Sequence, residues 1–221
     1  MKKLSLIIST FALIFLISCQ KEEFIAAPQQ GNDKVEVSAT LAESNQTRTQ
    51  HSSDFKKVYW SENDAISVFS SAEKCHDKYY ITNGAGTTAA NFQWDKTFNG
   101  VITGGIDTEG AQDNFYVGVY PFNEETSVNF SAGIYTINTE LPTNQNYAEN
   151  SFGQKALVMV GVDQVNAKPD FSFKNVGTIL IFPLNGNAKI ISATLKSVNG
   201  NKIAGKAVVT LSAEDNFIPV T

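Results

Sequence analysis

Few side chains in this chain of 221 residues have the chemistry that catalysis or metal binding requires. There are two cysteines and two histidines: Cys19, Cys75, His51 and His76. Cys75 and His76 are adjacent, so they could form part of a metal site only if two further ligands converged on them. The simpler interpretation is a loop thiol beside an imidazole. The chain contains no phosphate-binding loop, nucleophile elbow, zinc-protease motif or EF-hand loop. We therefore expect no metal, no cofactor and no enzymatic activity.

The first nineteen residues contain the clearest chemical signal. A basic start, Met1-Lys2-Lys3, precedes an uncharged apolar run over residues 4–18. This run is shorter than the ~20 apolar residues that a membrane-spanning helix needs, and it is typical of a secretory signal. It ends in Leu16-Ile17-Ser18-Cys19, which resembles the bacterial lipobox. The resemblance implies cleavage between Ser18 and Cys19 and attachment of lipid to the Cys19 thiol, where fatty acyl chains such as palmitate anchor the protein. A signal anchor that is never cleaved is the alternative.

The residues after the lipobox predict where the protein is located. Gln20-Lys21-Glu22-Glu23 looks like the acidic export tag of surface lipoproteins in Bacteroidetes, although an ordinary solvated tether would have similar charges. The tag implies a lipid-anchored protein that faces outward from the outer membrane. Removal of residues 1–18 deletes Lys2 and Lys3 and leaves 15 basic against 22 acidic side chains, a net charge of −7. Such a surface argues against binding of nucleic acid through a basic patch.

Residues 34–221, which follow a polar tether over residues 19–33, have the pattern of an all-β domain. The first predicted strand has apolar residues at alternate positions, which indicates one buried face: Val35, Val37, Ala39 and Leu41. Further strands are predicted over residues 65–70, 78–82, 114–120, 133–138, 156–160, 169–173, 177–184, 188–198, 206–211 and 216–220. Asn199-Gly200 is the strongest hairpin signal. Many short strands separated by turn residues predict an antiparallel β-sandwich.

Arg48 is the sole arginine among the 17 basic side chains. It lies in a polar run over residues 44–53, and polar loops are where proteases reach the backbone. An Arg-specific protease would cut between Arg48 and Thr49 and would release the segment that contains the first strand. The simpler interpretation is an ordinary exposed arginine.

The order of these features resembles the fimbrillin family, the subunits of the type V pili of Bacteroidales. The lipobox and the early alternating strand are the first matching parts, and Thr47-Arg48-Thr49 follows them. The segment from Trp60 to Phe69 resembles the family's W-x-x-x-D-x-I-x-V-F pattern. The later matches are Tyr116-Val117-Gly118-Val119-Tyr120-Pro121 and residues 173–180 and 190–205.

The resemblance implies a fold, a function and a set of partners. The fold is a transthyretin-like antiparallel β-sandwich over residues 34–221, the first of the two domains that the family has in tandem, with the second absent or truncated. The function is that of a structural pilus subunit. Cleavage after Arg48 would remove the lipid anchor together with the first strand, an edge strand of the sandwich, and a strand from another subunit would replace it. The partners would be the same or related subunits, and the sequence leaves open whether this one belongs to the shaft, the tip or the anchor.

A second function remains open, that of a permanently anchored adhesin that binds a glycan or a host surface. In that case several aromatic side chains would be exposed and would stack on sugar rings: Trp60, Trp94, Tyr79 and Tyr80. The simpler interpretation places these aromatic residues in the core of the sandwich.

Overall fold

The computed structural model describes the chain over eleven stretches: residues 36–42, 50–51, 58–71, 76–98, 115–131, 133–148, 151–153, 155–164, 168–178, 180 and 185–212. The chain divides into two compact units, Met1–Asp33 and Lys34–Thr221, and every described residue belongs to the second. The predicted signal peptide, its cleavage site between Ser18 and Cys19, and the tether lie outside the described residues, as does Val35.

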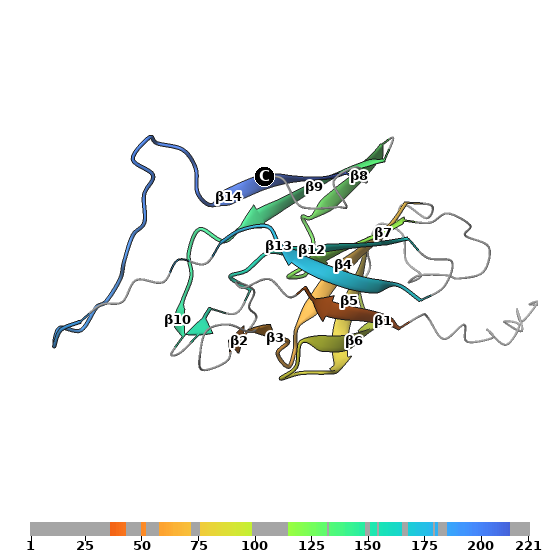
Figure 1. Ribbon diagram of the computed structural model, residues 1–221, viewed down its shortest axis with the longest axis horizontal. Coiled ribbons are helices and arrows are strands. Elements are labelled where there is room, and N and C mark those ends of the chain that lie inside the picture. Colours follow the sequence, from red (N-terminus) through yellow and green to blue (C-terminus); the bar gives the residue numbers. More distant parts are fainter. Residues whose placement is uncertain are drawn as a thin grey trace, which may run out of the picture. The chain divides into compact units, whose positions relative to one another are not determined.

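The described residues form strands and no helix, so the predicted all-β class is confirmed. The largest sheet is a closed barrel in the order β1-β13-β12-β7-β4-β5-β6 (Figure 1). Its strands are β1 (Val37–Leu41), β4 (Ala65–Ser70), β5 (His76–Asn83), β6 (Ala89–Trp94), β7 (Phe115–Tyr120), β12 (Met159–Gln164) and β13 (Asp170–Asn175). Neighbouring strands of the barrel are antiparallel, except that β1 and β13 are parallel. The largest sheet is therefore a closed barrel and not the antiparallel sandwich that we expected, so only the all-β class of that prediction is confirmed.

A second sheet packs on the outside of the barrel. Its strands are β8 (Ser127–Ser131), β9 (Ile134–Leu141) and β14 (Gly205–Ser212), in the order β14-β9-β8. Tyr135, Ile137, Val209 and Leu211 of this sheet share one buried cluster with residues of β4, β7 and β12. Both faces of β4 and β7 are therefore covered, which explains why β7 is almost continuously apolar and why β4 buries even its serines, Ser67 and Ser70. Two short pairs complete the described strands: β2 (Gln50–His51) with β3 (Val58–Tyr59), and β10 (Tyr147–Ala148) with β11 (Ser151–Phe152).

Trp60 lies at the centre of the core inside the barrel. It is fully buried and makes edge-to-face contacts with Phe92, Tyr120 and Phe173 at centroid distances of 5.1, 5.6 and 5.6 Å. Asp64, which is buried near it, accepts the Tyr120 hydroxyl hydrogen at 3.0 Å through one carboxylate oxygen. The other oxygen accepts the backbone N–H of Ser61 at 2.7 Å.

These contacts give the tryptophan–aspartate pattern a structural role. The turn between Trp60 and Asp64 is closed by the aspartate itself, so that the tryptophan enters the core while the carboxylate stays hydrogen-bonded. Burial and the nearby Asp64 carboxylate raise the pKa of Tyr120 above its usual value, which keeps its hydroxyl protonated as a donor.

Several predicted strands are confirmed and others are wrong. The predictions for β1, β4, β5, β7, β9, β13 and β14 match the structure to within a few residues. The strand predicted over residues 156–160 begins later, at Met159. The segment over residues 188–198 has no strand, and Gly177, Thr178 and Leu180 have none either. The strand predicted over residues 216–220 lies outside the described residues.

Candidate functional site

The first strand is the part of the described chain to which the sequence assigns a role in assembly, and the structure changes its expected position. We expected an edge strand, and this is wrong, because β1 lies between β6 and β13 and closes the barrel. The backbone N–H groups of Ser38 and Ala42 donate to the carbonyls of Pro169 and Phe173 at 3.0 and 2.9 Å on one side. The Leu41 N–H donates to the Thr88 carbonyl at 2.9 Å on the other side.

The predicted alternation of β1 is confirmed, and it determines what the strand contributes. Val37, Ala39 and Leu41 point into the barrel and are 0%, 1% and 3% exposed, while Thr40 is exposed. The three buried side chains belong to the same core cluster as Trp60, Phe92, Phe171 and Phe173. β1 therefore completes both the hydrogen-bonded wall of the barrel and its apolar filling.

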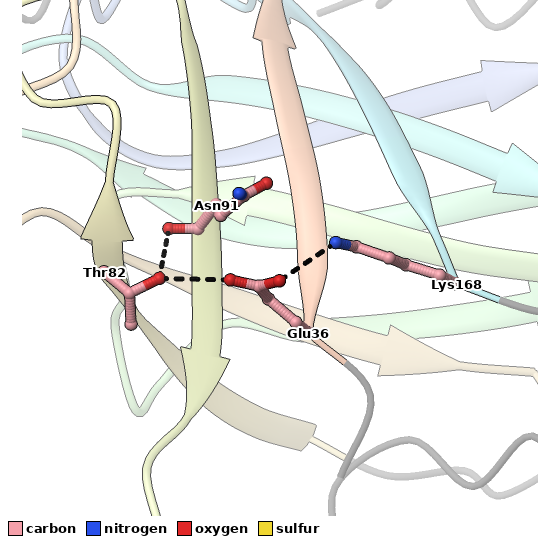
Figure 2. A network of polar contacts seen from close by, with 4 residues as sticks. All are labelled: Glu36, Thr82, Asn91 and Lys168. Carbon is pink, nitrogen blue, oxygen red and sulfur yellow. Dashed lines mark hydrogen bonds and ion pairs between the residues drawn. The ribbon is translucent and has the colours of Figure 1, made fainter. Parts of the chain in front are cut away.

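A polar network joins the start of β1 to the neighbouring strands (Figure 2). Glu36 accepts from the Lys168 ammonium at 3.1 Å through one oxygen and lies 3.3 Å from the Thr82 hydroxyl through the other. The same hydroxyl lies 3.2 Å from the backbone carbonyl of Asn91, so its single hydrogen serves one acceptor at a time. The Lys168 and Glu36 side chains are 42% and 44% exposed, and exposed pairs of this kind contribute about 0.2–1 kcal/mol. The network positions the start of β1, but the backbone hydrogen bonds and the buried side chains hold the strand more strongly.

The predicted processing site follows β1 in the sequence. Arg48 and Thr49 lie outside the described residues, in the stretch of sequence between Ala42 and Gln50. In sequence order the site follows β1 and precedes β2, so a cut there would separate β1 covalently from the rest of the domain.

The aromatic residues considered for sugar binding are mainly core residues. Trp60 and Tyr79 are fully buried, and Trp94 is partly buried against the barrel core. Tyr80 is 41% exposed, and its hydroxyl lies 3.4 Å from the Gln93 side-chain oxygen. The four side chains therefore do not form one exposed platform.

His76 is the histidine at which the sequence raised the question of a metal. It stacks on Phe69 at a centroid distance of 4.4 Å, with Phe98 and Phe122 nearby, and its Nε2 atom lies 3.1 Å from the Ser67 hydroxyl. Burial lowers the pKa of His76 to about 4, so the ring is neutral at pH 7. Its neighbour Cys75 lies outside the described residues. Within the described stretches, no group of three His, Cys, Asp or Glu side chains is placed to hold a metal ion.

Sequence reasoning missed two features of this region: the second neighbour of β1 and the Glu36 network. The second neighbour follows from long-range pairing, for which the local pattern has no signal.

No helix in the part of the chain that the structure describes is long and apolar enough to cross a membrane. Comparisons with protein-family models, with curated proteins and with solved structures found no match to this chain.

Proposed function

We propose that this protein is a surface lipoprotein that acts as a structural pilus subunit, and that β1 is the strand exchanged between subunits. The observation that carries the proposal is the position of β1: the first described strand of the domain completes the barrel wall and the barrel core at once. The lipid anchor at Cys19, the outer-membrane location, the cut after Arg48 and the transthyretin-like character of the fold are parts of the same proposal, and they rest on the sequence motifs.

Loss of β1 would create a strong acceptor for another strand. Both β6 and β13 would lose a partner, so the slot would have two rows of free backbone groups instead of one. A buried donor or acceptor that is left without a partner costs about 1–3 kcal/mol. The places of Val37, Ala39 and Leu41 would open onto an apolar interior. An incoming strand with small or medium apolar residues at alternate positions would restore both the hydrogen bonds to β6 and β13 and the apolar core of the barrel.

The two-sided pairing also changes how the exchange must proceed. A strand held by two neighbours does not separate simply because the chain is cut beyond its end, since its hydrogen bonds and its three buried side chains remain. Cleavage after Arg48 therefore leaves β1 bound without a covalent link. Exchange then requires an incoming strand that displaces β1 from one end. The exposed Glu36–Lys168 pair lies at the N-terminal end of β1, where the polar contacts are weak.

One observation favours the second candidate function, a permanently anchored adhesin. The barrel is already closed by its own β1, so the domain is complete without a partner strand. In that case β1 would never leave, and the barrel would act only as a rigid support for a binding surface.

The experiment that separates the two functions starts from the lipidated full chain. An Arg-specific protease is added, and Arg48→Lys serves as the uncleavable control. A labelled peptide with the sequence of residues 34–48 is then supplied in excess. The pilus proposal expects the cleaved protein to incorporate the peptide and to leave the membrane, whereas the control does neither. If the cleaved protein keeps its own strand and stays anchored through many hours of peptide excess, strand exchange is refuted and the adhesin function remains.

A further inference from the structure

The segment before β14 has the composition of a strand but none of a strand's partners. Residues 185–204 form no strand, and the apolar side chains Ile190, Ile191, Leu195, Val198 and Ile203 are 56%, 93%, 54%, 102% and 50% exposed. This is the blue segment that leads into β14 in Figure 1. So much apolar surface along one continuous stretch is unusual for a folded domain and indicates a surface that is covered in another conformation.

β14 offers an open edge directly beside this segment in sequence. It is eight residues long and pairs along its whole length with β9. Among the strands that the structure describes, β14 is the last of its sheet, so its other side has no partner strand. A long edge of this kind, beside which the structure describes no strand, is a template for a further strand.

The turn that would bring the segment back onto β14 is already formed. The Gly200 N–H donates to the Ser197 carbonyl at 3.3 Å, and Gly200 has a φ of 75°. A turn followed by a left-handed glycine is the arrangement of three-residue hairpin loops. Gly205, at the start of β14, has a φ of 102°. The pairing of β14 with β9 runs from Gly205 without a shift of register. On the open side of β14, a glycine in that conformation permits a bulge, which would shift the pairing with an added strand by one residue.

We infer that residues 188–197 form a strand that adds, antiparallel, to the open edge of β14 in the same chain. The turn at Gly200 places Leu195 opposite Ile203. Beyond the bulge at Gly205, Ile191 lies opposite Val208 and Ile190 lies opposite Val209.

The register matches apolar residues on both faces. Val209 is fully buried and pairs with the buried Ile137 of β9, so Ile190 extends the apolar row that faces the barrel. Val208 is 54% exposed on the outer face, where Ile191 covers it. Lys189, which directly precedes Ile190, lies on the outer face opposite Thr210, where its ammonium group stays in water.

The added strand gives the domain a protected edge. It covers backbone groups that would otherwise pair with other chains, and it buries side chains that would otherwise favour aggregation. The inference does not depend on the proposed function, because it concerns the sheet outside the barrel and not the place of β1. A second copy could offer the same segment to the same edge, and the test distinguishes the two sources.

The test uses disulfide formation in the full chain with Cys19 and Cys75 replaced by serine. Ile191→Cys with Val208→Cys places two exposed positions opposite each other, and directly paired strand residues have Cα separations of about 5.5 Å or less, within the range of a disulfide. Ile190→Cys with Val208→Cys is the matched control, because its side chains would lie on opposite faces. We expect an intramolecular disulfide at least about tenfold faster in the first variant than in the control. Equal rates overturn the inference, and so does a disulfide that joins two copies.

A second measurement tests the turn without cysteines. Hydrogen exchange over residues 188–197 should be slowed by the ladder in the unmodified chain. Gly200→Val should abolish this protection because a β-branched residue is strained at positive φ, whereas Gly200→Asn should retain it because asparagine tolerates that region. If the segment exchanges at the rate of an unstructured peptide in all three proteins, the added strand does not exist.

Discussion

Leu41→Ala directly tests the role of β1 as the strand that completes the barrel core. Leu41 is 3% exposed and packs in the same cluster as Trp60 and Phe173. Replacement of a buried leucine by alanine costs about 2–5 kcal/mol, because it removes apolar contacts and leaves a cavity. Thr40, the next residue in the chain, is exposed, and Thr40→Ala should cost less than about 0.5 kcal/mol. The two changes remove side chains from opposite faces of one strand.

The assays for this pair are thermal unfolding and then cleavage. A loss of about 3 kcal/mol should lower the melting temperature of a domain of this size by about 6–12 °C. After cleavage at Arg48, the same loss should make the N-terminal fragment dissociate about a hundredfold more readily, since each 1.4 kcal/mol is a factor of ten. Thr40→Ala should change neither quantity appreciably. Equal effects of the two substitutions would refute the reasoning that the inward face of β1 holds the strand in place.

Three further predictions concern the rest of the domain. Gly118→Ala should destabilise the fold by about 1–3 kcal/mol, since its added Cβ would lie 2.9 Å from Phe173; Gly177→Ala, with open space around it, is the control, and urea midpoints compare the two. Asp64→Ala should cost more than Tyr120→Phe, about 3 against about 1–2 kcal/mol, because the aspartate accepts two hydrogen bonds; their coupling is measured in the double variant. The lowered pKa of His76, about 4 against 6.5, means that the unfolded state binds the proton more readily. The contribution of neutral His76 to the free energy of unfolding is therefore complete above pH 6.5 and is lost as the pH falls towards 4. His76→Phe should flatten this pH dependence in urea midpoints measured from pH 7 to pH 4.5.

The local patterns of the sequence predicted the strands well where one face of the strand is exposed to solvent. β1 is the clear case, since Val37, Ala39 and Leu41 alternate with polar residues and are the buried ones. β7 was recognised from β-branched and aromatic residues, although its continuous apolar run did not reveal that a second sheet covers its other face. β6 and β8 were missed although both alternate, because each alternation covers only two or three apolar residues.

The candidate site was predicted only in part. Its three inward side chains were identified correctly, but their strand was expected at an edge. The segment over residues 188–198 shows the opposite error: it has the composition of a strand, and the described fold gives it no partner. In both cases the composition of a segment indicates that it can pair, and contains no information on how many neighbours it will have.

The amino-acid sequence by itself determined the all-β class, the inward face of β1 and the single arginine at position 48, and it carries the lipobox-like pattern that ends at Cys19. Each of these depends on residues close together in the chain. Only the tertiary structure decided that β1 lies between β6 and β13, that the barrel is closed, and that β14 is the last described strand of its sheet. These features depend on hydrogen bonds and apolar contacts between segments far apart in sequence. The free energy of such pairing comes from the whole set of neighbours, and a local pattern of residues cannot specify it.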